Sequence, residues 1–342
     1  MNPSEQPSAA DIAYQSAITW LYDRIDYERN RPVTQEPFRL ERIQRLLTRI
    51  GSPHLQIPSI HIAGTKGKGS TAAMLESIAR HAGIRTGLFT SPHIEQFEER
   101  MRVNGHMPSP ETLTRLVQQL RTLLESPQVD EADRMPTFFE AATLLAWMLF
   151  AEQQVQLVVL ETGLGGRLDC TNVCQPIVTV ITSIGFDHMQ ILGHTLDLIA
   201  AEKAGILKPG IPVVQGQLPP AADEVVANRA AELGCRRFVC GAEFAWTDES
   251  PSDARRSQPR SQQLDFWTPA GAYRGITLPL LGRHQAHNAS LAVMAAELAL
   301  AVHEPEAGRG RGHGAFYVSL LQDGAEGRTR RVLRGGRKNR QQ

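Results

Sequence analysis

The sequence predicts an α/β fold: a doubly wound, mostly parallel β-sheet with a P-loop, helices on both faces and a small accessory β-sheet. Two observations favour this fold. A short alternating strand pattern at 59–63 leads directly into the glycine-rich segment 64–70, and a helix-prone segment follows at 71–81. Beyond it, apolar strand patterns alternate with helix patterns as far as residue 233, which is typical of a parallel sheet with crossover helices.

Each further element follows from its local pattern. Two N-terminal helices are predicted at 11–29 and 38–50, where apolar residues recur at helical spacing and Gly51 ends the second helix. The other predicted elements are strands at 85–90, 155–160, 177–182 and 211–214, helices at 137–152, 195–204, 221–233 and 287–302, and a hairpin of 263–267 with 273–280. This hairpin is the predicted accessory sheet.

The composition is that of a globular protein. Of the 342 residues, 42% are hydrophobic and 21% charged, and the formal net charge is zero at pH 7, which gives no reason to expect a nucleic-acid or anionic-membrane partner. No apolar run approaches the roughly 20 residues of a membrane helix, and the first residues do not resemble a signal peptide. We therefore expect a cytoplasmic, monomeric protein that acts on small molecules and keeps its four cysteines reduced.

The composition changes near the end of the chain. Residues 303–342 are rich in Gly and Arg and have little periodic apolar pattern. They are predicted to be an unstructured tail rather than part of the folded domain at 1–302. A basic tail that binds nucleic acid is the alternative interpretation.

The strongest chemical signal is the segment Gly64-Thr65-Lys66-Gly67-Lys68-Gly69-Ser70. Glycines let the backbone curl so that successive N–H groups point at phosphate oxygens, and the positive end of the following helix adds to the attraction. Lys68 is expected to reach the β- and γ-phosphates, and the Ser70 hydroxyl to meet a Mg²⁺ ion. A plain turn is the alternative, but the position between strand and helix favours an ATP-binding loop formed by all seven residues.

Three other residues are informative but ambiguous. Glu161 ends an apolar strand, at the edge where open α/β sheets place their ligands, so its carboxylate is a candidate Mg²⁺ ligand. A helix cap or an ordinary ion pair is the alternative. His188, alone, would more often be structural, and Lys203 would more often be a solvated charge.

Further segments match one protein family in the same order. They are Ser91-Pro92-His93, Thr137-Phe138-Phe139-Glu140, the run from Glu161 to Asn172, Asp187-His188 and Glu202-Lys203-Ala204-Gly205. Together with the loop at 64–70, which is shorter than the usual P-loop, they resemble the folylpolyglutamate synthase and dihydrofolate synthase family of the Mur ligase superfamily. The resemblance covers about residues 11–302 and implies that residues 1–302 form a Mur-ligase-type ATP-binding domain.

The resemblance implies an ATP- and Mg²⁺-dependent ligase that joins L-glutamate to a folate-type carboxylate. The substrate would be tetrahydrofolate, dihydropteroate or both. The carboxylate would take the γ-phosphoryl group of ATP to form an acyl phosphate, which the glutamate amine would attack. Protein groups would mainly position the reactants and stabilise transferred charge.

The resemblance also assigns residues to roles. It implies the catalytic residues Lys68, Glu161, His188 and Lys203, and the metal ligands Ser70, Ser91, Glu161 and His188. It implies carbamoylation of Lys203, and substrate contacts from Thr137, Phe138, Phe139, Glu140, Leu168, Asp169 and Cys170. Either phenylalanine could instead belong to the core. Asn288 is expected near the adenine of ATP, although a helix cap is an equal alternative.

The sequence departs from the family near its end. Family members carry a second, Rossmann-like domain after the helix near Asn288, with Trp-Pro-Gly-Arg and Asp-Gly-Ala-His-Asn segments, and neither segment occurs here. An inactive nucleotide-binding remnant is therefore one alternative. Another Mur-type amino-acid ligase is a second, which the segments at 91–93 and 137–140 disfavour. A general P-loop ATPase or GTPase regulator is disfavoured by the shortened loop and the absence of an Asn-Lys-x-Asp segment.

Overall fold

The structure is a computed structural model of the 342-residue chain, and it describes residues 8–26, 40–249 and 261–303. The predicted tail lies outside these residues, except for His303 at the end of the last helix. The domain boundary at residue 302 and the nature of the tail therefore stay predictions. Within the described ranges, none of the helices is both long and apolar enough to cross a membrane.

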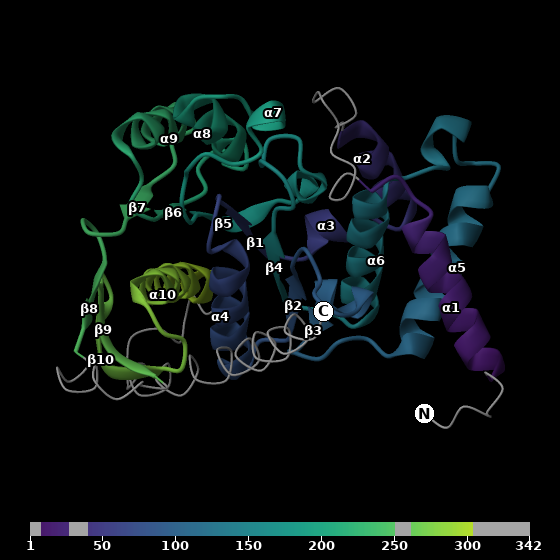
Figure 1. The fold of residues 1–342 in the computed structure, drawn as a ribbon, viewed down its shortest axis with the longest axis horizontal. Helices are drawn as coiled ribbons and strands as arrows, with labels where there is room; N and C mark the ends of the chain where they lie inside the picture. The colour runs from purple at the N-terminus through teal and green to yellow at the C-terminus, as the bar shows by residue number, and fades with distance from the viewer. Residues whose placement is uncertain (1–7, 27–39, 250–260, 304–342) are drawn as a thin grey trace, which may run out of the picture.

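A seven-stranded sheet forms the centre of the molecule (Figure 1). The strands are β1 (Ser59–Ala63), β2 (Thr86–Phe89), β3 (Met101–Val103), β4 (Leu157–Glu161), β5 (Pro176–Ile181), β6 (Val213–Gln215) and β7 (Arg237–Val239). Their order in the sheet is β3-β2-β4-β1-β5-β6-β7. Only β3 is antiparallel to its neighbour β2; the other neighbouring pairs of this sheet are parallel. The predicted mostly parallel α/β fold is confirmed.

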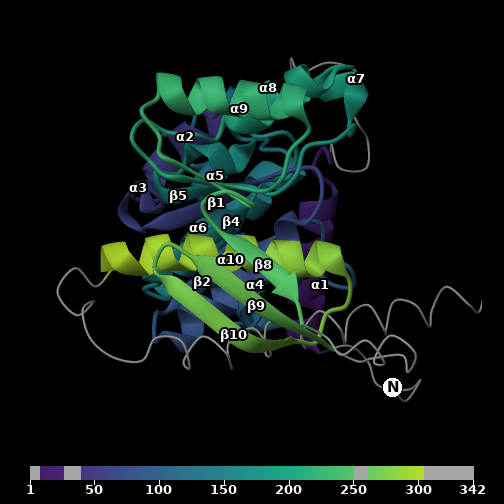
Figure 2. The same cartoon turned by 90° about the vertical axis from the view of Figure 1, so that its left-hand side faces the viewer.

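Helices cover both faces of this sheet. The longer ones are α1 (Ala9–Tyr22), α2 (Leu40–Arg49), α4 (Lys68–His81), α5 (Pro110–Glu125), α6 (Phe138–Glu152), α8 (Leu196–Ala204), α9 (Pro220–Glu232) and α10 (Arg283–His303). Figure 2 shows α8 and α9 on one side of the sheet and α4 and α10 on the other. In β4, Val159 packs in the cluster of α4, whereas Val158 and Leu160 pack with α6, because successive strand residues point to opposite faces.

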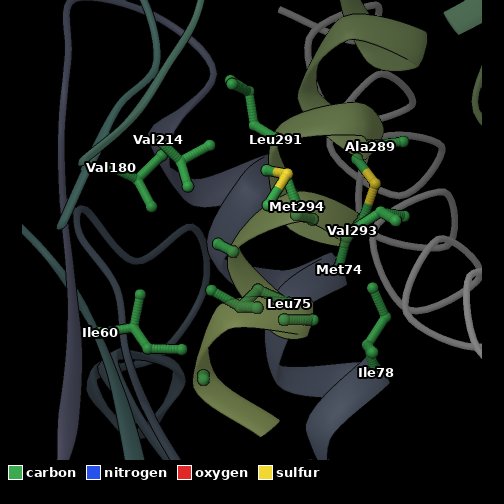
Figure 3. Packing of buried hydrophobic residues seen from close by; sticks show 14 of the residues in the cluster. Ile60, Met74, Leu75, Ile78, Val180, Val214, Ala289, Leu291, Val293 and Met294 are labelled. Carbon is green, nitrogen blue, oxygen red and sulfur yellow. The ribbon is translucent and has the colours of Figure 1, made fainter. Parts of the chain in front are cut away.

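The core between the sheet and its two long helices is aliphatic. Figure 3 shows Ile60, Val180 and Val214 of three strands facing Leu75 of α4 and Met294 of α10. All five side chains are buried. Both faces of β1 and β4 are buried along their whole length, which explains why these strands carry continuous apolar runs rather than a strict alternation.

A second, three-stranded antiparallel sheet lies beside α10 (Figure 2). Its strands are β8 (Ala245–Asp248), β9 (Gln262–Thr268) and β10 (Gly271–Leu278), in the order β10-β9-β8. The predicted accessory hairpin corresponds to β9 and β10 and is confirmed, whereas β8 was not predicted.

Several elements were not predicted from the sequence. The largest is α5, a 16-residue helix whose first turn is stabilised by the Ser109 hydroxyl, which accepts a hydrogen bond from the Thr112 amide. Strands β3 and β7 have only three residues each, too few for a periodic pattern. In addition, α1 ends at Tyr22, and so is shorter than the predicted helix at 11–29.

Candidate active site

The predicted P-loop, Glu161 and His188 lie at or after the carboxyl ends of three neighbouring strands. Strand β1 lies between β4 and β5 in the sheet. It runs directly into the loop at 64–67, while β4 ends at Glu161 and β5 is followed by Thr182 and Ser183. The chain crosses β1 when it passes from β4 to β5, which makes this edge a topological switch point, the usual ligand site of such sheets.

Close packing requires glycine at two positions of the P-loop. Gly67 has φ 85° and caps α4, and a Cβ atom there would lie 2.3 Å from Asn288 Oδ1. A Cβ atom on Gly64 would lie 2.0 Å from Thr182 Oγ1. Side chains at these positions would separate the loop from β5 and α10.

Hydrogen bonds fasten the P-loop to the end of β5. The Thr65 and Lys66 amides donate to Ser183 O and Ser183 Oγ, at 2.8 and 2.9 Å. Thr182 Oγ1 donates to Lys66 O at 2.7 Å. These bonds hold the loop in shape at the N-terminal end of α4, where backbone amides commonly bind phosphate oxygens.

Thr182 and Ser183 were not identified as site residues from the sequence. A polar Thr-Ser pair directly after a buried strand is the signal that could have found them. The prediction missed them because their partners lie more than 100 positions earlier in the chain.

Asn288 is not a helix cap. It is the sixth residue of α10, which begins at Arg283. Its amide nitrogen donates to Gln285 Oε1 at 3.1 Å, and its carbonyl oxygen faces Gly67. The helix-cap alternative is therefore wrong, and Asn288 lies against the P-loop.

Lys203 is buried behind the same loop, with only 2% of its surface exposed. Its Nζ donates to Gly64 O at 3.0 Å. Burial, together with the nearby charge of Lys68, lowers the pKa of Lys203 to about 8, although Asp187 and Asp169 oppose the shift. Three charged side chains of the surrounding segments therefore act on the Lys203 amine.

Glu161 and Ser91 are brought together. The Glu161 side chain is 5% exposed, and its Oε2 accepts a hydrogen bond from the Ser91 amide at 3.2 Å. Ser70 is buried in the first turn of α4. His188, in a left-handed conformation with φ 46°, precedes the short helix α7 (Met189–Leu192), and its Nε2 lies 3.4 Å from Asp187 Oδ1.

The described residues contain no cluster of three or more His, Cys, Asp or Glu side chains suited to a metal ion. The predicted metal ligands instead combine the imidazole of His188 with three oxygen donors, the hydroxyls of Ser70 and Ser91 and the carboxylate of Glu161. Such oxygen donors suit Mg²⁺, which keeps several waters and is rarely enclosed by protein ligands alone.

The segment at 137–140 begins α6 with a capping box. The Glu140 amide donates to Thr137 Oγ1 at 3.2 Å, and the Thr137 amide donates to Glu140 Oε2 at 2.7 Å. Arg42 Nη1 also lies 3.2 Å from Glu140 Oε2. Both polar side chains of this predicted substrate segment therefore have structural partners.

The two phenylalanines differ in environment. Phe138 is completely buried, stacks on Tyr22 with 5.6 Å between ring centroids, and lies 4.9 Å from the Arg100 guanidinium carbon. Phe139 is half-buried, and its ring lies against Gly163, where a Cβ atom would be 2.6 Å away. Phe138 is thus part of the core, and Phe139 lies next to the loop that follows β4.

That loop, residues 162–172, follows the strand of Glu161 and packs against the end of α8, the helix of Lys203. The Arg167 amide donates to Glu202 O at 2.8 Å, and Asn172 Nδ2 donates to Gly205 O at 3.1 Å. Leu168 and Cys170 are half-buried within it. Burial raises the pKa of the Cys170 thiol well above its usual value, so Cys170 is not a reactive thiolate.

Asp169 anchors the loop from within. Its carboxylate accepts hydrogen bonds from the Leu164 amide at 2.8 Å and the Thr171 amide at 3.0 Å, and it caps the short helix η3 (Cys170–Val173). Burial raises the pKa of Asp169, and these hydrogen bonds oppose the shift.

Comparison with known proteins agrees with this geometry. The family model of the Mur ligase middle domain matches residues 62–296. The dihydrofolate synthase/folylpolyglutamate synthase of Bacillus subtilis is 41% identical over 291 residues, which are 83% of this chain and 63% of that protein. This chain therefore spans less than two thirds of the length of that relative.

Solved structures show the same fold. The apo form of L. casei folylpolyglutamate synthase (FPGS) is 30% identical, with a TM-score of 0.81 over 91% of this chain and 72% of that one. A structure described as an FPGS-AMPPCP-folate complex is 31% identical, with the same TM-score and coverage. The chain belongs to the folylpolyglutamate synthase and dihydrofolate synthase family of Mur ligases.

Proposed function

We propose that this protein is an ATP-dependent ligase that joins L-glutamate to a folate-type carboxylate through an acyl phosphate. One observation carries the proposal: the P-loop is fastened to the end of β5 and lies directly against buried Lys203, at the sheet edge that also holds Glu161. The B. subtilis relative is named for this activity, and the FPGS structure is described as a complex with AMPPCP, an ATP analogue, and folate.

The nucleotide is proposed to bind along the P-loop and the N-terminal end of α4. Thr65 and Lys66 hold the loop in shape, and the amides of 67–70 bind phosphate oxygens. Lys68 supplies a positive charge to the β- and γ-phosphates. Asn288 lies against Gly67 and is proposed to contact the adenine side.

Ser70, Ser91, Glu161 and His188 are proposed to hold Mg²⁺. The contact of Glu161 with the Ser91 amide supports these two residues, because it brings a buried carboxylate next to a serine. When bound, the ion would neutralise phosphate charge. The contribution of the protein is to keep the Glu161 carboxylate next to Ser91.

Lys203 is proposed to be carbamoylated. With a pKa of about 8, about a tenth of the Lys203 amines are neutral at pH 7, and only the neutral amine reacts with carbon dioxide. The change would replace a buried cation by an anion and would remove its repulsion with Lys68. A carbamate carbon signal from ¹³C-bicarbonate, present in the wild type and absent in Lys203→Arg, would support the modification.

The folate-type substrate is proposed to bind near the loop that follows β4. Its contacts would come from the segment at 137–140, in which Phe139 is the phenylalanine next to that loop, and from Leu168, Asp169 and Cys170. Phe139 offers aromatic surface to a flat heterocycle. These residues would hold the carboxylate of the substrate next to the γ-phosphate of ATP.

The test is ADP release by the purified 342-residue chain with MgATP, L-glutamate and either dihydropteroate or tetrahydrofolate. Each component is omitted in turn. We expect release that requires glutamate and one of the two pterins, which would also identify the substrate. ATP binding without ADP release would contradict the proposed ligase activity. A cytoplasmic location and a monomeric state stay predictions.

A further inference from the structure

A histidine lies beneath the candidate site, and the proposed function makes no use of it. His61 is the central residue of β1 and has no exposed surface. Its Nε2 lies 2.8 Å from Thr171 Oγ1, on the loop that follows β4. Thr171 in turn bonds through its hydroxyl and its amide to Asp169 Oδ1. A buried chain of hydrogen bonds thus runs from the centre of the sheet to Asp169.

The direction of each hydrogen bond follows from counting protons. A hydroxyl has one proton, and Thr171 gives it to the Asp169 carboxylate. Thr171 Oγ1 must therefore accept from His61, which puts the imidazole proton on Nε2. Burial lowers the pKa of His61 to about 3, so the imidazole is neutral and its other ring nitrogen, Nδ1, carries a lone pair. Nδ1 has no hydrogen-bond partner among the described residues.

Asp169 holds a loop that contacts two parts of the candidate site, the proposed substrate segment and the helix of Lys203. Its carboxylate holds the Leu164 amide. Next to Leu164, Gly163 lies against the ring of Phe139. Gly166 lies against the backbone of α8, where a Cβ atom would be 3.0 Å from Lys203 O. A change at Asp169 would therefore shift the loop relative to the proposed substrate segment and relative to Lys203.

We propose that His61 is a positioning residue that orients Asp169 through Thr171 and so fixes the loop at 163–169 for the folate-type substrate. The inference rests on the proposed function for the identity of that substrate. His61 touches no substrate itself. Its Nε2 carries a proton and so cannot accept the proton of the Thr171 hydroxyl. The hydroxyl therefore donates to the Asp169 carboxylate, which fixes the position of that carboxylate.

The first experiment compares matched variants in the full chain. His61→Leu removes the donor, and His61→Gln keeps an amide N–H near the place of Nε2–H. Thr171→Val removes the next link in the chain. His54→Leu is the control, because His54 is also a buried histidine, in the short helix α3 (Pro53–Gln56), and also has an unpartnered Nδ1.

We expect His61→Leu to raise KM for the folate-type substrate and lower kcat, by about tenfold in kcat/KM. The Kd of ATP should change much less, because the P-loop is hydrogen-bonded to Thr182 and Ser183 and not to Thr171 or Asp169. His61→Gln should recover most of the loss. Thr171→Val should resemble His61→Leu, and the double variant should be no worse than either.

Two outcomes would overturn the inference. One is an equal loss in His61→Leu and His54→Leu, which would mean that a buried histidine at either position only supports folding. The other is additive effects of His61→Leu and Thr171→Val, which would mean that the two residues act separately. Folding of each variant is checked by its urea unfolding midpoint.

A second measurement does not depend on ligase activity. Long-range ¹H–¹⁵N spectra of the wild type should show His61 with its proton on Nε2, and a proton on Nδ1 would contradict the proposal. Amide exchange at Leu164 and Thr171 should quicken in His61→Leu but not in His61→Gln or His54→Leu. A wild type without ligase turnover would refute the proposed function, while these spectra would still decide the role of His61.

Discussion

At the scale of single residues, contacts between distant segments decide how the candidate site works. Gly67 touches Asn288, Gly64 touches Thr182, and Lys203 reaches the carbonyl of Gly64. The glycines and the lysine could be predicted, because each belongs to a local motif. Asn288 was expected near ATP only from the family resemblance, and Thr182 was not expected at all, since nothing in a local pattern tells which strand end or helix will lie opposite a loop.

Two glycines with the same backbone conformation allow a clean test of the P-loop contact. Gly67 and Gly83 both have φ +85°, but a Cβ atom meets Asn288 only at Gly67 and meets nothing within 4 Å at Gly83. Alanine at either position should lower the free energy of unfolding by about 1–2 kcal/mol, because a Cβ atom is strained in the left-handed conformation. Only Gly67→Ala should also weaken ATP binding, as measured by calorimetry. Equal ATP affinity in the two variants would exclude a role for the Asn288 contact.

The buried histidine of β1 predicts how stability depends on pH. The folded pKa of His61, about 3, lies below its ordinary value of 6.5, so the unfolded chain binds more protons between these values. The contribution of neutral His61 to the free energy of unfolding is complete above about pH 6.5 and is lost as the pH falls towards 3. Between pH 7 and pH 5 the loss should be about 2 kcal/mol.

Urea unfolding of the wild type and His61→Gln at pH 7 and pH 5 would measure this loss. The variant should lose less stability on acidification than the wild type. His284→Gln is the control, because His284 is exposed and should leave the dependence on pH as it is. The same pH dependence in all three proteins would contradict the assignment to His61.

At the scale of elements, the sequence predicted those with long or distinctive patterns. Strand β1, the P-loop and α4 follow from one motif, and β4 and β5 follow from buried apolar runs. Helix α5 was missed although it has an N-cap, and β3 and β7 are too short to show alternation. These short strands are set by pairing with neighbours, which is a tertiary effect.

The start of α6 links helix stability to the proposed substrate segment. Thr137→Ala removes the acceptor for the Glu140 amide and should cost about 1 kcal/mol, whereas Thr137→Ser should cost little. Ser109→Ala is a matched control, because Ser109 caps α5 in the same way. Both alanine variants should lose similar stability in urea. Only Thr137→Ala should weaken binding of the folate-type substrate; equal weakening would mean that the segment has no special role.

At the scale of the whole molecule, one strand of the sheet and two helices on the same face meet at one loop. Helix α4 begins in the P-loop, β5 ends against it, and α10 contacts it through Asn288. The parallel sheet and the accessory sheet could be predicted from the order of strand and helix patterns. The convergence on one loop could not, because it depends on the strand order β4-β1-β5.

Nucleotide binding should therefore stabilise the whole domain. An ATP analogue at one hundred times its Kd should add about 2.7 kcal/mol, seen as a higher melting temperature. Gly67→Ala should show a smaller increase at the same analogue concentration, because the change weakens binding. A melting temperature that does not respond to the analogue would argue against a nucleotide site at this loop.

The bonds between the P-loop and Ser183 also bear on binding kinetics. The amides of Thr65 and Lys66 are paired within the protein, so the loop keeps its shape without a ligand. A nucleotide that meets a preorganised loop loses little free energy to ordering it. Association should then occur in a single step, with a rate that rises linearly with nucleotide concentration and reaches no plateau.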